Sequence, residues 1–426
     1  MKSAPRRVRV KSGKASFVAI PAVASAAALL IAGCSSSSSS STPSGSSSSS
    51  GASASASASS GSGATASISA TELTNDFSAM AALKDVASKG KGNVAVILPD
   101  TTSSARYTEF DAPYLTKAFQ AAGLDSSQFT VQNAQGSDTT EFTDAQEAIT
   151  KGATVLIMDP LDSGVGAQIE NYAKSHGVSV IDYDRITSSG SRQYYVSFDN
   201  VKVGTLIGNG FVSCASSWGV TKPEVLVMKG APTDNNATLF AEGYLAVLQP
   251  HFNDGSMVLV GTPAGTWDPP TAESEFQQQF TAHKNINSAV VPNDENAAPI
   301  ITYLQRQGIK AKSFPVTGQD ATLVGLQNIL SGYQCGTVYK PIYQEAQAAA
   351  ALALFIRAGQ TAPSSLVNGT TKDPGNGTEV PSVLLTPEWV TTQNMNDTVI
   401  ADKFVEASAL CTSQYADDCK SAGISG

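Results

Sequence analysis

Short apolar runs alternate with segments of helical periodicity along most of this 426-residue chain. The runs at residues 93–99, 153–160 and 178–184 are apolar with little alternation, which is typical of parallel strands covered by helices on both faces. The same rhythm restarts after residue 200 and continues to about residue 318. Two consecutive series of this kind predict an α/β fold of two doubly wound, Rossmann-like lobes with parallel sheets.

The end of the chain departs from this rhythm. A strand at residues 336–341, a long Ala-rich helix and an extended piece at residues 380–390 would have no sheet to join if the second lobe were already complete. They fit if the chain returns to the first lobe and then crosses back. This predicts three crossover strands, near residues 197–200, 335–340 and 381–387. The predicted N-terminal lobe comprises residues 93–198 and 341–382, and the predicted C-terminal lobe residues 199–338 and 385–410.

The first 33 residues have the features of a secretory signal. They begin with a basic stretch without acids and continue with small apolar residues up to Cys34. The sequence LLIAGC resembles the bacterial lipobox, in which the cysteine carries the lipid. A transmembrane anchor is the alternative, but the apolar run is short and Ala-rich for one. Residues 34–70, rich in Ser, Gly and Ala, are predicted to be a disordered tether. We therefore expect a lipid-anchored body on the extracytoplasmic face of the cell membrane.

The charge of the chain excludes some partners. The formal net charge is −9, and removing the signal, which holds six basic residues and no acid, brings it near −15. An acidic body argues against nucleic acid, whose binding depends on neutralising phosphates. It also argues against a polybasic patch that holds a membrane surface.

Four cysteines remain once Cys34 is assigned to lipid. An even number outside the cytoplasm predicts two disulfides. Cys411 and Cys419 enclose a short polar loop and are expected to pair, which leaves Cys214 with Cys335. Four cysteines allow three pairings, so this one is a preference, and free buried thiols are the alternative. We expect no metal site, because there is no CxxC pair and no histidine close to a cysteine. Residues 411–426 are predicted to be a disulfide-closed tail.

Polar residues gather where the predicted strands end. In open parallel sheets, ligands bind beyond the carboxyl ends of the strands. The strand ends hold Asp100, Asp159, Asp182, Asp184, Arg185, Asp234, Asn235, Asn236, Asn293, Asp294, Gln319 and Asp320. Nearby stand Arg106 and Tyr107 at the first helix, Trp267 after a strand, and Lys340 at the end of a crossover strand. The three histidines, His176, His251 and His283, fall at helix C-termini instead, where the dipole favours a cation.

This distribution argues against catalysis. A His-based acid or base, a Ser–His pair and a His-rich metal site would all lack their central residue. Hydrolysis by two carboxylates remains chemically possible. However, a general acid needs apolar surroundings that raise its pKa, and here Arg185, Lys340 and several amides accompany the acids. We therefore predict no catalytic residue and no cofactor.

Carboxylates, amides, fixed cations and flat aromatic rings suit a sugar. A hydroxyl donates and accepts, so one acidic and one amide or guanidinium group can satisfy it together. Trp267 and Tyr107 are expected to bracket the ring from opposite lobes. Of the three residues 234–236, one is expected to cap the following helix and the other two to face sugar oxygens. For Asp159, Asp199 and Asp294, helix capping is as good an explanation as ligand contact.

The stretches VIDYDR, YYVSFDNVKVG, GAPTDNNATLF, VTGQDA, TVYKPI and LLTPEWV occur in this order. With them, residues 93–405 resemble the type I periplasmic binding proteins, most closely the D-xylose-binding proteins of ABC importers. The resemblance implies two lobes that close around one aldopyranose. The ligand-binding residues that we predict are Arg106, Tyr107, Arg185, Asp234, Asn236, Trp267, Asn293, Asp320 and Lys340. Tyr107 departs from the family, which usually has Trp there, and the tail from Cys411 has no recognised family equivalent.

The resulting hypothesis is a substrate-binding lipoprotein of a sugar importer. It is expected to be a monomer that binds an aldopentose or aldohexose, with D-xylose as the first candidate, and passes it to an ABC permease and its ATPase. A sugar-sensing protein that reports to a receptor and a surface carbohydrate-acting enzyme are the alternatives.

Overall fold

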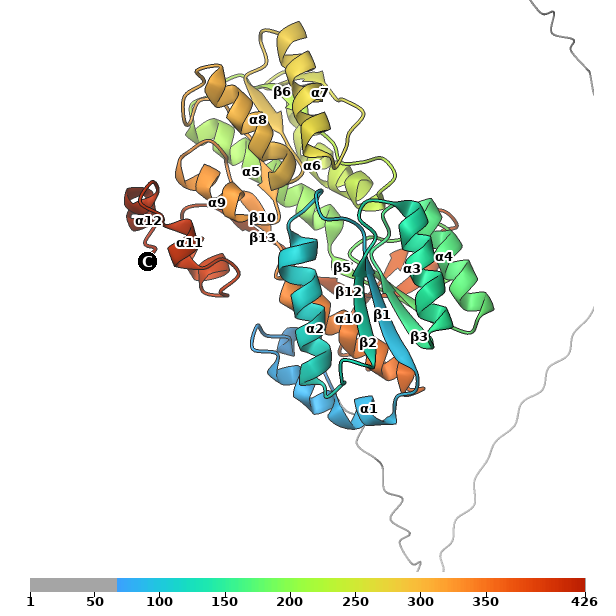
Figure 1. Ribbon diagram of the computed structural model, residues 1–426. Helices are drawn as coiled ribbons and strands as arrows, with labels where there is room; N and C mark the ends of the chain where they lie inside the picture. The colour runs from blue at the N-terminus through green and yellow to red at the C-terminus, as the bar shows by residue number, and fades with distance from the viewer. Residues whose placement is uncertain (1–66, 426) are drawn as a thin grey trace, which may run out of the picture. The chain divides into compact units, whose positions relative to one another are not determined.

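Mainly parallel sheets, with β11 and β13 as antiparallel strands, form the frame of the computed structural model, which describes residues 67–425 (Figure 1). The predicted signal, Cys34 with its predicted lipid, and nearly all of the predicted tether lie outside the described residues. Among residues 67–425, no helix is both long enough and apolar enough to span a membrane.

The first lobe contains a seven-stranded sheet in the order β11-β12-β5-β4-β3-β1-β2. All neighbouring strands are parallel except β11, which runs antiparallel to β12. The strands are β1 (Asn93–Leu98), β2 (Phe129–Asn133), β3 (Ala153–Met158), β4 (Ser179–Tyr183), β5 (Tyr194–Phe198), β11 (Gly369–Lys372) and β12 (Glu379–Leu385). The long apolar runs of the sequence thus become central strands that are buried on both faces.

Helices cover both faces of this sheet (Figure 1). In β1, Val94 and Val96 pack with α2 (Ala112–Ala121) and α10 (Ile342–Arg357), whereas Ala95 packs with α3 (Asp138–Thr150) and α4 (Ser163–Ser175). Almost all of α10 is buried, and its run of alanines lets the helix lie close against the strands.

The second lobe is built on two three-stranded sheets, β7-β6-β8 and β13-β10-β9, linked by a bridge between Ala289 and Val316. The strands are β6 (Glu224–Val227), β7 (Val258–Gly261), β8 (Ser288–Val290), β9 (Gly318–Gln319), β10 (Thr337–Tyr339) and β13 (Glu388–Val390). The helices are α5 (Asn200–Ser217), α6 (Asn235–Asn253), α7 (Pro269–Ala282), α8 (Asp294–Arg306) and α9 (Leu323–Leu330). Helices α5 and α6 cover one face of β6, and α7 and α8 cover the other.

The chain changes sheets three times. It leaves β5 in the first sheet for α5, leaves β10 in the second lobe for α10, and runs from β12 into β13. The extended piece that we predicted as one strand is therefore two strands in different sheets, interrupted at Thr386 and Pro387. The proline has no N–H to donate, which fits a break between the two ladders.

The sequence analysis missed an ordered segment before β1. Residues up to 70 were expected to be a tether, yet Ile68 is 1% exposed and Ser69 caps a short 3-10 helix (Ala70–Glu72). A second 3-10 helix (Ser78–Leu83) and α1 (Lys84–Lys89) follow, and they pack on α2 and α10. The buried side chains of this segment are Ile68, Leu73, Phe77, Met80, Leu83 and Val86. They are spaced singly among small residues, which hides the amphipathic pattern in the sequence.

One helix prediction also differs in kind from the structure. The helix expected from residue 106 opens as a π-helix (Tyr107–Asp111) before α2, and a second π-helix (Asn396–Ile400) lies near the end of the chain. Phe110 from the first π-helix stacks on Phe404, with 4.0 Å between the ring centroids. A turn with π geometry is common at functional sites, and the first of these two precedes α2 beside Arg106.

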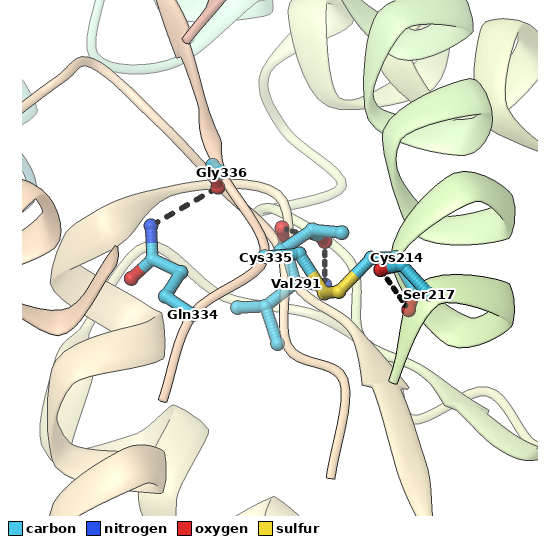
Figure 2. The surroundings of a disulfide bond; sticks show 7 residues. Cys214, Ser217, Val291, Gln334, Cys335 and Gly336 are labelled. Carbon is cyan, nitrogen blue, oxygen red and sulfur yellow. Dashed lines mark hydrogen bonds between the residues drawn. A yellow bond between two sulfur atoms is a disulfide. The ribbon is translucent and has the colours of Figure 1, made fainter. Parts of the chain in front are cut away.

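Both disulfides join the cysteines that the sequence favoured. Cys214 of α5 is bonded to Cys335, just before β10, as Figure 2 shows. Cys411 is bonded to Cys419 in the tail, which follows α11 (Ala407–Leu410) and holds α12 (Ala416–Ser421).

We predict that the two disulfides contribute unequally to stability. The chain-entropy model assigns about 5 kcal/mol to a bond that closes a loop as long as that between Cys214 and Cys335, and about 2.5 kcal/mol to the short loop of the tail. The sequence separations are 121 and 8 residues. Denaturant unfolding of the two double Cys→Ala variants measures this, and an equal loss of unfolding free energy in both would contradict it.

A second prediction concerns Glu141 on α3, which is buried and accepts the Leu161 N–H. Burial raises its pKa from 4.5 to about 8. Between these two pH values the unfolded chain releases the proton and the folded chain keeps it, so the folded state loses stability as pH rises. Glu141→Gln removes this penalty. It should match the wild type near pH 4.5 and be more stable by up to about 3 kcal/mol at pH 7.

Thermal unfolding at the two pH values measures the difference. Glu147→Gln is the matched control, because this residue lies on the same helix but is exposed. A stability gain of Glu141→Gln that does not change with pH would contradict the prediction.

Candidate ligand-binding site

A cavity between the two lobes brings the predicted site residues together. It has about 310 Å³ of empty space, part of it open to solvent. The lining residues are Ser103, Ser104, Arg106, Tyr107, Asp184, Arg185, Asp234, Asn236, Phe240, Trp267, Asn293, Gln319, Asp320 and Lys340. All nine residues that we predicted as ligand-binding are among them. Asp184 and Gln319 were placed at strand ends but not selected, whereas Ser103, Ser104 and Phe240 were missed.

The carboxyl ends of the strands account for this convergence. Asp184 and Arg185 follow β4, Asp320 follows β9 and Lys340 follows β10. Parallel strands present their carboxyl ends at one edge of a sheet, and here the edges of two sheets face each other across the cavity. Phe240 had no such signal, because it lies one turn after Asn236 within α6, where an apolar residue is expected to pack in the core.

Arg106 is surrounded by carboxylates. Its Nε lies 2.8 Å from Asp111 Oδ2, and its Nη2 lies 2.6 Å from Glu345 Oε2. Its Nη1 lies 2.9 Å from Asp184 Oδ1 but is not aligned for a hydrogen bond with any described residue. The guanidinium that we predicted as a ligand donor is therefore largely engaged within the first lobe, and Nη1 is the atom left with hydrogen-bonding capacity.

Arg185 links the aromatic and acidic sides of the cavity. Its Nη2 donates to the Tyr107 hydroxyl at 2.9 Å, and its Nε lies 3.4 Å from Asp234 Oδ2. Behind it, Asp159 is fully buried, and burial raises the pKa of Asp159 well above its usual value while Arg185 lowers it. Asp159 is therefore a partner of Arg185, at 3.6 Å, and not the helix cap that the sequence allowed.

Asp234 serves two purposes at once. Its Oδ1 accepts the Asn236 N–H at 2.8 Å and so caps α6, while its Oδ2 accepts from Trp267 Nε1 at 2.9 Å. The sequence analysis expected the capping residue to be separate from the two that face the ligand. Instead the capping residue lines the cavity together with Asn236, and Asn235 does not line it.

The amide of Asn236 and the indole of Trp267 are both fixed by neighbours. Asn236 Nδ2 donates to the Asp184 carbonyl at 3.0 Å, and Asn236 Oδ1 accepts from Asn200 at 2.9 Å. The Trp267 ring lies against Gly230, where a Cβ atom would collide with it. Trp267 also meets Phe240 edge to face, with 6.4 Å between centroids.

Lys340 and Asp320 form an ion pair at 3.0 Å, and the Ser104 hydroxyl donates to the other Asp320 oxygen at 3.2 Å. Burial lowers the pKa of Lys340, but the carboxylates of Asp320 and Asp184 outweigh it and leave that pKa raised. Lys340 is thus an ammonium at neutral pH.

The formal charges of the cavity wall cancel. Among its lining residues there are three cations and three carboxylates: Arg106, Arg185, Lys340, Asp184, Asp234 and Asp320. A buried ion that lacks a counter-charge is costly. The cavity therefore suits a ligand that is itself neutral and offers hydroxyl groups able to donate and accept.

Hydrogen bonds across the cavity hold the lobes together. The Ala105 N–H donates to Glu295 Oε1 at 2.9 Å, and Asn293 Nδ2 donates to the Ser103 carbonyl at 3.2 Å. On the other side, the Ser163 N–H donates to the Thr233 carbonyl at 3.0 Å. Glu295 was not predicted, because it is one of two acidic residues in the first turn of α8, where acids are common.

The remaining assignments can be compared with the structure. Asp199 caps α5, as the sequence allowed, by accepting the Lys202 N–H at 2.9 Å. Asp294 does not cap α8, because Asn293 does. The histidines lie at the C-terminal ends of α4, α6 and α7, as predicted: His176, His251 and His283.

Comparison with known proteins shows which family has this fold. The periplasmic binding protein domain matches residues 94–361. This chain belongs to that family. The chain is 37% identical over 295 residues to the D-xylose-binding periplasmic protein of Escherichia coli, covering 68% of this chain and 85% of that protein. It is 29% identical over 336 residues to a multiple sugar-binding periplasmic receptor of Rhizobium radiobacter, covering 75% and 92%.

A solved structure extends the similarity to the whole fold. The carbohydrate transporter solute-binding protein of Chloroflexus aurantiacus, in complex with D-glucose, superposes with a TM-score of 0.67. It is 28% identical and covers 74% of this chain and 97% of that one. The two-lobed architecture predicted from the sequence is therefore that of the family.

The contact of Glu295 yields a prediction about lobe closure. Without its carboxylate, the partly buried Ala105 N–H would lose its acceptor when the lobes are together, at a cost of about 1 kcal/mol, and would be hydrated when they are apart. Glu295→Ala should therefore shift the protein toward an open form with a larger radius of gyration in small-angle X-ray scattering.

Glu295→Gln keeps an acceptor and should resemble the wild type, and Glu242→Ala on the exposed face of α6 is a further control. An unchanged radius of gyration in Glu295→Ala would show that this contact does not hold the lobes.

Proposed function

We propose that this chain is the extracytoplasmic substrate-binding lipoprotein of a sugar ABC importer. It binds one aldose between its lobes, with D-xylose as the first candidate, and delivers the sugar to the permease. The observation that carries the proposal is the cavity wall, in which three cations and three carboxylates balance beside Trp267 and Tyr107. Relatives whose names state a sugar ligand support it.

The wall offers each kind of contact that a sugar ring needs. Asp320 and Asp234 supply acceptors, Arg185 and Lys340 supply donors, and Asn236 supplies both. Charge-assisted hydrogen bonds of this kind are stronger than neutral ones. The flat rings can cover the apolar C–H faces of a pyranose, which stack on aromatic side chains.

Two features favour a small sugar. Three aromatic side chains, Tyr107, Phe240 and Trp267, limit the space between the lobes. The E. coli relative, 37% identical, is named for D-xylose, a pentose whose pyranose ring has no exocyclic CH₂OH group. A relative named for multiple sugars and the solved structure in complex with D-glucose keep an aldohexose as the alternative ligand.

In the proposed cycle, both lobes bind the same sugar molecule. A sugar that contacts both lobes stabilises their closed arrangement, which shifts the population toward it. The lipid predicted on Cys34 would keep the protein on the extracytoplasmic face of the membrane, next to the permease. Binding returns the sugar unaltered, in keeping with a family of binding proteins.

A sensory role is the second candidate. The R. radiobacter relative is named a receptor, so sugar occupancy of this protein could be reported to a receptor instead of a permease. Both roles use the same cavity. Neighbouring genes for a permease and an ATPase would favour import.

Calorimetric titration with D-xylose, D-glucose, D-galactose, L-arabinose and D-ribose tests the proposal. We expect saturable heat with at least one aldose, strongest with D-xylose, and loss of that heat in Asp320→Ala, because Lys340 then keeps an unpaired charge at the ligand. The ligand-free variant should keep nearly the wild-type thermal stability, because water that enters between the open lobes hydrates Lys340 when no sugar is bound.

Asp199→Asn is the matched control, since it changes an exposed capping acid outside the cavity for another good cap. Absence of heat with every aldose would refute the proposal. A large loss of stability in ligand-free Asp320→Ala would show that Asp320 has a structural role instead.

A further inference from the structure

We infer that Asp294, a buried residue outside the cavity wall, is a positioning residue that sets the places of Asp320 and Lys340 for ligand binding. The inference rests on the proposed function. Asp294 is 0% exposed and touches no part of the cavity. Its carboxylate instead lies between the chain segment that carries Asp320 and the segment that carries Lys340, the two residues of the ion pair at the cavity.

The segment that carries Asp320 has an unusual backbone. Asp320 and Ala321 have φ angles of 90° and 49°, two consecutive residues in a region that favours glycine. Such a conformation persists only where its surroundings hold it, and it is frequent at functional sites. Here it turns the chain sharply between β9 and α9 and aims the Asp320 carboxylate at the cavity.

Asp294 holds the far side of this turn. Its Oδ2 accepts the Thr322 N–H at 2.9 Å and the Thr322 hydroxyl at 3.2 Å. The Thr337 hydroxyl lies 3.0 Å from Asp294 Oδ1, and Thr337 Oγ1 also accepts the Ala321 N–H at 3.1 Å. Ala321, the second residue of the left-handed pair, and Thr322, the residue after it, are thus both fixed through one carboxylate.

The same carboxylate holds the strand that carries Lys340. Thr337 begins β10, which leads directly to Lys340. Gln334 Nε2 donates to Asp294 Oδ1 at 2.7 Å and to the Gly336 carbonyl at 3.2 Å, the second of which Figure 2 shows beside the disulfide of Cys335. Asp294 therefore contacts both the segment that carries Asp320 and the strand that leads to Lys340, and these two segments meet in the Asp320–Lys340 ion pair.

The surrounding chain is shaped to admit this carboxylate. A Cβ atom at Gly318 or at Gly325 would collide with the oxygens of Asp294. Helix capping does not explain the residue, because Asn293 already accepts the Asn296 N–H at the start of α8. Burial raises the pKa of Asp294 to about 7, while hydrogen bonds from Thr322, Gln334 and Thr337 lower it. A buried acid that served packing alone would be replaceable by an apolar residue.

The test compares two variants with one control. Thr337→Val is nearly isosteric and removes the hydroxyl between Asp294 and Ala321. It should weaken D-xylose binding about tenfold, which is the effect of one lost hydrogen bond. Asp294→Asn replaces an acceptor with an NH₂ group facing an N–H donor and should weaken binding about a hundredfold. Asp268→Asn, which replaces the exposed N-cap of α7 with another good cap, should leave binding unchanged.

A double-mutant cycle separates positioning from general destabilisation. If Thr337 acts through Asp320, the tenfold loss should largely disappear when Thr337→Val is made in the Asp320→Asn background. An undiminished loss in that background would overturn the inference, as would a loss of melting temperature without any change in affinity.

A ligand-free measurement keeps this inference independent of the proposed function. Hydrogen exchange of the Ala321 and Thr322 amides should be at least about tenfold faster in Thr337→Val than in the wild type. Unchanged exchange would overturn the positioning role even if sugars bind. Conversely, if no aldose binds the wild type, the proposed function fails while the exchange result still decides whether Asp294 holds the turn.

Discussion

Charge compensation inside the cleft is the constraint on which the rest of the structure depends. Three cations lie at the cavity, and each is within 3.6 Å of at least one carboxylate. Buried charges are tolerated only when they are paired and hydrogen-bonded. The three cations and three carboxylates that line the cavity cancel formally. The site is therefore unsuited to an anion or a cation. It presents strong donors and acceptors to a neutral molecule, and this is why a sugar is the ligand that we propose.

The fold supplies these pairs from distant parts of the sequence. Arg106 reaches Glu345 on α10, and Lys340 reaches Asp320 across neighbouring strands. The contact between Arg106 and Glu345 requires the chain to return to the first lobe after building most of the second. The same path places Glu295 of α8 against Ala105 of the first lobe. The residues that line the cavity and those that join the lobes thus come from neighbouring strand ends.

Much of the site could be predicted from the sequence because a simple rule applied. Residues such as Arg185, Asp234 and Asp320 follow apolar strands directly, and parallel strands bring their ends to one edge. Phe240 and Glu295 escaped prediction because nothing distinguishes a cavity-facing position within a helix from a core or surface one. Likewise, the ordered segment that begins near Ile68 has single apolar residues in a small-residue context, and its burial depends on α10, which is far away in the sequence. The sequence could not predict that Asp234 both caps α6 and lines the cavity, because the same residue types serve either purpose.

A crystal structure of the protein grown with D-xylose tests the central claim most directly. The account predicts one pyranose ring in the cavity between the lobes, with hydroxyls hydrogen-bonded to Arg185 of the first lobe and to Asp320 of the second. A cavity occupied by a charged molecule, or a sugar that contacts only one lobe, would contradict it.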